Sequence, residues 1–177
     1  MTNAELAVLS LLSEKPRHGY DIEAQIEDRG MRDWTDIGFS SIYAILKKLE
    51  KKGWVEAEYA QSVGQGAPRK VYRITTSGLE AQLSAVIEAL SNPGRPNSSL
   101  LLGLSNLPVI SKDQALEALG QYGMALEARL GQLLMRADEQ QPLPDFVEAM
   151  FDYSTAMIAT ELAWLNEYIQ KLETQDG

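Results

Sequence analysis

The chain of 177 residues contains no cysteine, one histidine and no run of 18 apolar residues. The lack of cysteine excludes disulfides, thiolate nucleophiles and cysteine-ligated zinc. His18 is the one imidazole that could act as a base, and the sequence has neither a Walker phosphate loop nor a Gly-x-Gly-x-x-Gly turn. We therefore expect no enzymatic activity, no metal and no cofactor.

The N-terminus also lacks the basic and then apolar pattern of a signal peptide, because Glu5 and Glu14 bracket its short apolar run. No segment is apolar for long enough to span a membrane. Hydrophobic residues make up 45% of the chain, which is ample for a packed core. These features predict a soluble, cytoplasmic protein with no membrane partner.

Positive charge is scarce overall, since the formal net charge is −9. Its distribution is uneven: residues 81–177 hold 5 basic and 13 acidic residues, whereas residues 40–73 hold 7 basic and 3 acidic ones. Salt screens remote charges beyond about 8 Å. The local excess of +4 in residues 40–73 is therefore compatible with binding a polyanion such as DNA.

Residues 40–75 have the pattern of a basic helix followed by a β-hairpin. Ile42, Ile45, Leu46 and Leu49 recur at helical spacing within Ser40–Gly53, and lysines occupy the remaining faces. Two alternating segments, 54–59 and 71–74, predict strands. Gly64, Gly66 and Pro68 lie at the tip between them, and Arg69 and Lys70 follow. A helix able to enter a DNA groove, next to a hairpin able to reach the backbone, is a winged helix.

Helices are predicted on both sides of this segment. Thr2 and Glu5 are spaced as a capping box before one helix, and a second helix is predicted from about His18 to Arg29. A further helix follows the hairpin, with Ser77 and Glu80 as its expected capping box. The fold class is thus mainly α with a small β-hairpin. We expect an N-terminal winged helix-turn-helix domain at 1–90, a linker at 91–97 rich in turn-forming residues, and a helical dimerisation domain at 98–177.

The C-terminal domain contains a heptad row. Ser111 and Gln114 are spaced as a capping box, and apolar residues follow at steps of 3, 4, 3, 4 and 3 from Leu116 to Leu133. A second long helix is predicted after residues 140–144. We expect these helices to form an antiparallel pair whose apolar surface a second copy covers; the alternative is that both rows pack within one monomer. The residues assigned to the dimer interface are Leu116, Leu119, Leu126, Leu130, Leu133, Met150, Tyr153, Met157, Trp164 and Leu165.

Three N-terminal segments together resemble the PadR family of bacterial transcriptional regulators. The segment Pro16–Ile22 is similar to the family's Pro-x-His-Gly-Tyr-Glu-Ile motif, 41–53 to its recognition helix and 66–75 to its wing. Residues 161–165 are similar to a segment of the longer members. Ala67 stands where many relatives have a second basic residue in the wing. The resemblance implies a winged-helix dimer, usually a repressor, whose DNA affinity a small molecule can alter.

The candidate DNA-contacting residues come from the predicted basic helix, the wing and the motif at the start of the second helix. For Tyr43 the alternative is packing against Tyr20 or Trp34, and for His18 it is a local cap or packing role. The partners expected are operator DNA, a second copy of the chain and a small-molecule effector. The alternative function is a winged-helix module that binds proteins without specific DNA binding. The DNA-binding candidates are His18, Tyr20, Ser40, Ser41, Tyr43, Lys47, Lys48, Arg69 and Lys70.

Overall fold

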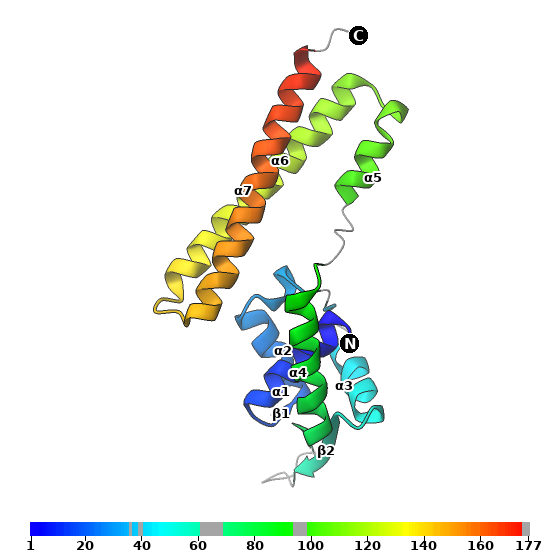
Figure 1. Ribbon diagram of the computed structural model, residues 1–177, viewed down its shortest axis with the longest axis vertical. Coiled ribbons are helices and arrows are strands. Elements are labelled where there is room, and N and C mark those ends of the chain that lie inside the picture. The colour runs from blue at the N-terminus through cyan, green and yellow to red at the C-terminus, as the bar shows by residue number, and fades with distance from the viewer. Residues whose placement is uncertain (36, 39–40, 61–68, 94–98, 175–177) are drawn as a thin grey trace. The chain divides into compact units, whose positions relative to one another are not determined.

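The computed structural model describes all residues except 36, 39–40, 61–68, 94–98 and 175–177 (Figure 1). The chain divides into two compact units, Met1–Arg95 and Pro96–Gly177. Among the described residues, no helix is both long and apolar enough to cross a lipid bilayer.

The first unit contains four α-helices, a short 3-10 helix and three strands within its described residues. The order is α1 (Asn3–Glu14), β1 (Arg17–His18), α2 (Gly19–Asp28), η1 (Met31–Asp33), α3 (Ile42–Lys51), β2 (Val55–Ala60), β3 (Arg69–Ile74) and α4 (Thr76–Ser91). The expected capping box of Thr2 and Glu5 at the start of α1 is confirmed.

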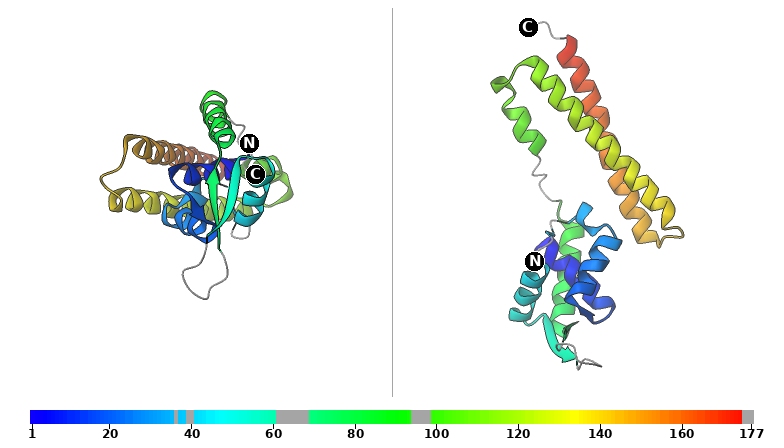
Figure 2. Two further views of the ribbon diagram at one scale, coloured as in Figure 1. Left: turned by 90° about the horizontal axis from the view of Figure 1, so that it is seen from below. Right: turned by 180° about the vertical axis from the view of Figure 1, so that it is seen from behind.

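The three strands form an antiparallel sheet in the order β1-β3-β2. β2 and β3 are paired from Val55 opposite Ile74 to Ala60 opposite Arg69, so the predicted hairpin is confirmed (Figure 2, left). β1 was not predicted: the expected second helix begins one residue later, at Gly19, and His18 pairs with Val71. Two residues carry no recognisable alternation, so only pairing with β3 defines this strand.

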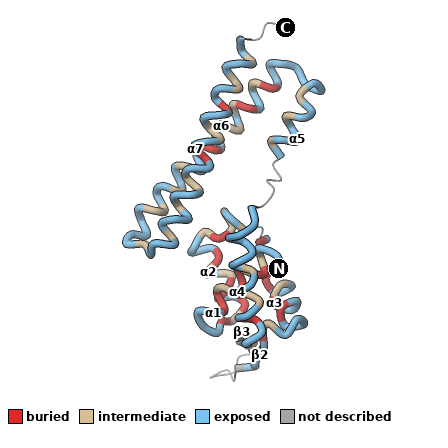
Figure 3. Tube along the Cα trace, in the orientation of Figure 1, coloured by how far each residue is buried: buried red, intermediate tan, exposed pale blue. Residues whose placement is uncertain are grey.

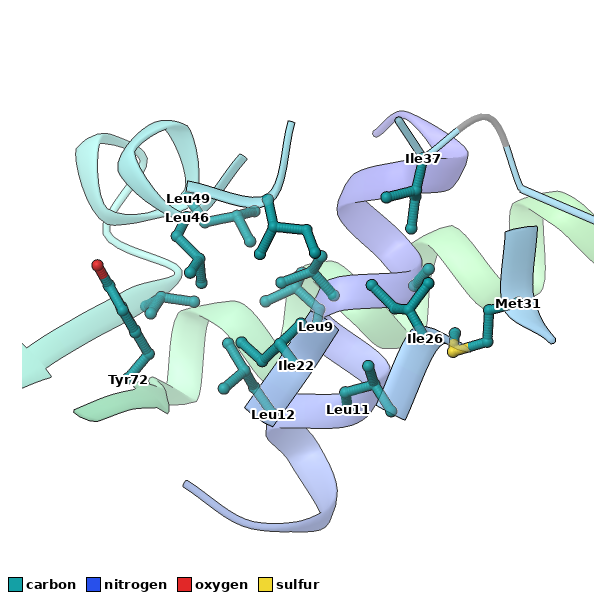
Figure 4. Packing of buried hydrophobic residues seen from close by; sticks show 14 residues of the cluster. Leu9, Leu11, Leu12, Ile22, Ile26, Met31, Ile37, Leu46, Leu49 and Tyr72 are labelled. Carbon is teal, nitrogen blue, oxygen red and sulfur yellow. The ribbon is translucent and has the colours of Figure 1, made fainter. Parts of the chain in front are cut away.

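Apolar side chains from α1, α2 and α3 form the core of the first unit. Buried residues are red along the chain trace in Figure 3. Leu9, Ile22 and Leu46 are fully buried and belong to one cluster (Figure 4). The helical spacing within 42–49 therefore marks the buried side of α3, as the sequence predicts. Arg17 is buried as well; its Nε donates to the Leu11 carbonyl (3.0 Å) and its Nη2 to Glu14 (2.6 Å).

The start of α4 differs from the prediction. Its N-cap is Thr75, whose hydroxyl accepts a hydrogen bond from the Gly78 amide (3.1 Å), so the expected capping box of Ser77 and Glu80 is wrong. Ser77 instead donates to the Gly53 carbonyl (2.9 Å). The helix begins two residues earlier than expected because Thr75 leaves β3 in an extended conformation suited to an N-cap.

The second unit contains α5 (Ser99–Ser105), η2 (Leu107–Val109), α6 (Lys112–Glu139) and α7 (Asp145–Thr174). α6 and α7 run alongside each other in opposite directions (Figure 2, right). The predicted capping box of Ser111 and Gln114 opens α6 and is confirmed.

Three leucines assigned to the expected dimer interface are already covered within a single chain. Leu165 is 0% exposed within a single chain, and Leu119 and Leu126 are buried too. At Gly123 an added Cβ would lie 3.2 Å from Leu165 Cδ2, so the glycine allows the close approach of the two helices. These three leucines therefore offer little surface to a partner, and Leu165 packs against α6 at Gly123. Leu116, Leu130 and Leu133 are half-buried.

A polar contact joins the same two helices. The Tyr122 hydroxyl donates to Glu161 (2.7 Å). Burial and this hydrogen bond to a carboxylate raise the pKa of Tyr122 to about 12. The phenol thus remains protonated, and the bond persists, across the physiological pH range.

Candidate nucleic-acid interface

The exposed side of α3 carries the first group of candidate residues. Ile42, Leu46 and Leu49 face the core, while Tyr43 and Lys47 are exposed. The helix begins at Ile42, and the Ser41 hydroxyl donates to the Gly38 carbonyl (2.6 Å). Ser40 lies outside the described residues.

A hollow of about 650 Å³ opens beside this helix. It lies where the start of α2, the first turn of α3 and the strand β3 meet. Its lining combines an imidazole, three phenols and an ammonium group, and the phenols and the ammonium group are able to donate hydrogen bonds to phosphate oxygens. The lining residues are His18, Gly19, Tyr20, Tyr43, Lys70 and Tyr72.

Gly19 gives the hollow its shape. An added Cβ would lie 2.6 Å from Tyr43 Cε1, closer than real Cβ contacts allow. The absence of a side chain therefore lets the Tyr43 ring lie over the start of α2. Tyr43 nevertheless remains 59% exposed, and Tyr20 is 49% exposed. Tyr43 thus lies against Gly19, a neighbour that the sequence analysis did not name, and its phenol stays accessible.

His18 links the start of α2 to the base of the wing. Its Nδ1 lies 2.9 Å from the Lys70 carbonyl oxygen, and its ring stacks on Tyr20 with centroids 5.3 Å apart and planes 7° from parallel. The His18 ring is therefore packed, as one alternative expects. It also lines the hollow, where a contact with DNA would be made.

Lys70, on β3, also lines the hollow. Its Nζ is 3.6 Å from Glu50 Oε2 and lies 5.7 Å from the Tyr59 ring centroid and 5.9 Å from that of Tyr72. Burial raises the pKa of the Tyr72 phenol. The backbone of Arg69 pairs with Ala60 in the sheet, and the wing residues 61–68, including the predicted tip, lie outside the described residues.

Lys48 has a different environment from the one expected. Its Nζ lies 3.1 Å from Glu5 Oε1, and Lys52 Nζ lies 2.8 Å from the same oxygen. Burial alone would raise the pKa of Glu5, but hydrogen bonds from Lys52, the Thr2 amide and Lys48 outweigh it and lower the pKa to about 2. Glu5 is 2% exposed. Lys48 therefore helps hold α3 on α1.

Replacing Glu5 by glutamine is expected to lower the free energy of unfolding by about 2 kcal/mol at pH 7, because the lysines lose a buried carboxylate. Since the folded-state pKa is lowered from 4.5 to about 2, the stabilisation is fully present above about pH 4.5 and is lost as the pH falls towards 2. Urea unfolding at pH 7 and pH 3 measures both effects. Glu58→Gln, on an exposed residue, is the control, with an expected change below ~0.5 kcal/mol. A Glu5→Gln deficit equal at both pH values would contradict this assignment.

Sequence reasoning missed the two carboxylates, Glu5 and Glu50, that pair with these lysines. Glu5 was recognised as a capping residue only, and it fills both roles: Oε2 accepts from the Thr2 amide (3.0 Å) while Oε1 meets the lysines. The spacing within α3 places Glu50 on the exposed side, but its contact with Lys70 depends on the packing of β3.

Removing the Glu50 charge is expected to strengthen DNA binding roughly threefold to tenfold, because Lys70 gains freedom to meet a phosphate and a like charge leaves the surface. Fluorescence anisotropy with Glu50→Gln measures the change. Glu127→Gln alters the net charge equally on α6 and should leave the affinity unchanged. An equal effect from both variants would mean that only overall charge matters.

Comparison with known proteins places this site in a family. A model of the transcriptional regulator PadR-like family matches residues 8–83. An uncharacterised protein, protein X of Lysinibacillus sphaericus, is 40% identical over 81 residues, which cover 46% of this chain and 72% of that protein. The chain belongs to the PadR-like family of transcriptional regulators.

Solved structures of PadR-like proteins share the fold over nearly the whole chain. PadR of Bacillus subtilis in complex with operator DNA has a TM-score of 0.76 at 21% identity, covering 95% of this chain and 98% of that one. The PadR-like regulator BC1756 of Bacillus cereus has a TM-score of 0.69 at 22% identity, covering 95% and 94%. PadR of Bacillus subtilis in complex with p-coumaric acid has a TM-score of 0.74 at 20% identity, covering 96% and 98%. The architecture is therefore a PadR winged helix followed by a helical region.

Proposed function

We propose that this PadR-like protein is a sequence-specific DNA-binding regulator, that it acts as a homodimeric repressor in the cytoplasm, and that a small molecule modulates it. Residues 1–90 would bind DNA, 91–97 would connect the domains and 98–177 would form the dimer. The observation that carries the proposal is the gathering of His18, Tyr43 and Lys70 around one hollow beside the exposed side of α3.

The chemistry of that surface supports a duplex as the ligand. Lys47 is exposed on α3, where a lysine can reach guanine acceptors in the major groove. Donors around the hollow suit phosphates, which position a protein on the duplex without reading its sequence. The fold likeness to a regulator crystallised with operator DNA agrees with this assignment.

Fluorescence anisotropy tests the proposal, using a labelled duplex from the region upstream of the protein's own gene, a scrambled duplex and a salt series. Binding of the upstream duplex at least ~10³-fold more tightly at physiological salt is expected. Equal binding of both duplexes with a steep salt dependence would indicate non-specific attraction to phosphate. No binding to either at low salt would contradict the proposal.

A protein-binding module is the second candidate, and the ion pairs favour it. Lys48 and Lys52 are engaged by Glu5, and Lys70 by Glu50, so fewer cations are available to DNA than the sequence suggests. If this candidate is right, Lys47→Glu combined with Lys70→Glu should leave the regulatory function of the folded protein unchanged.

Exposed apolar residues along α7 support the dimer. Tyr153 is exposed, as are Met150, Met157 and Trp164. All four lie on α7, which packs against α6. Sedimentation of the full chain should show a dimer, and Tyr153→Glu combined with Met157→Glu should show a monomer. Gln121→Glu, on an exposed position of α6, is the control. A double variant that remains dimeric would exclude this part of α7 from the interface.

A further inference from the structure

We infer that DNA binding takes up a proton at His18, so that the imidazolium Nε2–H donates to a backbone phosphate while Nδ1–H stays on the Lys70 carbonyl. This inference rests on the proposed DNA-binding function and specifies how one of its contacts works. Affinity for DNA would then rise as the pH falls.

The hydrogen bond between His18 Nδ1 and the Lys70 carbonyl oxygen, 2.9 Å apart, fixes the tautomer of the ring. A carbonyl oxygen accepts only, so Nδ1 must carry the hydrogen. In a neutral imidazole one ring nitrogen carries hydrogen and the other does not. The neutral ring of His18 therefore has a bare Nε2, which is an acceptor.

A bare Nε2 cannot donate to a phosphate oxygen, which also only accepts. Within the part of the chain that the structure describes, His18 Nε2 has no hydrogen-bond partner, and the ring lines the hollow beside Tyr43 and Lys70. Protonation turns Nε2 into a charged donor without disturbing the Nδ1 bond. A phosphate in the hollow would favour the charged form, since an opposite charge at hydrogen-bond distance does so.

His18 is the only histidine of the chain, so no second imidazole can take up a proton beside it. The groups facing it come from α2, α3 and β3, with Glu50 paired to the lysine. They are Tyr20, Asp21, Tyr43, Glu50, Lys70 and Tyr72.

The sign of the effect follows from linkage. Because the phosphate would hold the added proton on the ring, the extra affinity is fully present at low pH and is lost as the pH rises. A charge-assisted hydrogen bond of ordinary strength corresponds to roughly a tenfold decrease of affinity between pH 6 and pH 8 for each such bond.

Two substitutions separate the functions of the ring nitrogens. His18→Asn places an amide donor where Nδ1 lies and keeps the Lys70 bond, whereas His18→Gln places a donor near the position of Nε2. In anisotropy with the upstream duplex, we expect weak binding by His18→Asn and tighter binding by His18→Gln, each nearly independent of pH. Lys47→Gln is the control: its affinity should fall, but it should keep the pH dependence of the unmodified chain.

The informative quantity is the difference in the pH dependence of DNA affinity between the unmodified chain and His18→Asn. Equal dependence in the two would overturn the inference and leave the proposed function intact. Absence of binding at every pH would overturn both. Circular dichroism verifies that each variant is folded.

Nitrogen-15 NMR of the single histidine in the full chain provides a second test. The neutral ring should show the Nδ1–H form, and its titration should move to higher pH when the upstream duplex is added. The Nε2–H form in the free protein, or an unmoved titration in the complex, would overturn the inference.

Discussion

Replacing Lys47 and Lys70 together by glutamate is expected to weaken DNA binding by at least ~10²-fold at physiological salt. Lys47 is exposed on α3, and Lys70 lines the hollow. Each reversal removes a cation that can meet a phosphate and adds an anion that repels one. Neither side chain is part of the buried core, so the fold should persist.

Anisotropy over a salt series measures this effect. Lys112→Glu with Lys171→Glu changes the net charge identically on α6 and α7 and should leave the affinity nearly unchanged. Replacing Lys47 and Lys70 by glutamine instead should reduce the salt dependence by about one released counterion for each phosphate that is no longer neutralised. If the variant with both lysines replaced by glutamate folds and binds DNA with unchanged affinity, the surface formed by Lys47 and Lys70 does not contact DNA.

Gly78→Ala is expected to lower the free energy of unfolding of the first unit by more than ~3 kcal/mol. An added Cβ would lie 2.1 Å from the Trp54 carbonyl oxygen and 2.8 Å from Ile74 Cγ1. The carbonyl cannot move freely, because it accepts the Thr75 amide (3.0 Å) at the start of α4. The clash is thus with backbone, and relieving it requires α4 to shift from the sheet.

Gly131→Ala provides the matched control. Gly131 lies within α6 with open space around its Cα, so alanine should stabilise the second unit by up to ~1 kcal/mol through helix propensity. Urea unfolding in a Trp164→Phe background measures the first unit separately, since its remaining tryptophans, Trp34 and Trp54, both lie there. Equal stability of Gly78→Ala and the unmodified chain would contradict the close approach of Gly78 to the Trp54 carbonyl.

Local sequence signals predicted much of the fold. The apolar spacing of 42–49 identified the buried side of α3, and alternation identified the hairpin of β2 and β3. The capping boxes that open α1 and α6 were recognised because their hydrogen bonds join residues three apart. These features depend only on residues that are close in the sequence, so they can be predicted from a single sequence.

Several contacts between distant segments were not predicted. β1 exists only because β3 pairs with it, and Lys48 meets Glu5 only because α1 packs beside α3. The heptad row showed which residues of α6 are apolar, yet burial of Leu165 beside Gly123 was decided by the facing helix. A periodic pattern predicts that one face of a helix is buried, but it does not identify the element that covers that face.

The candidate site divides in the same way. The sequence by itself determined its residue types, the motif around His18 and Tyr20, and a basic helix followed by a wing. Only the tertiary structure decided that His18 donates to Lys70, that Gly19 admits Tyr43, and that Glu50 neutralises part of the surface. The physical reason is that these interactions act over a few ångströms between residues as many as 52 positions apart, and folding alone brings them within that distance.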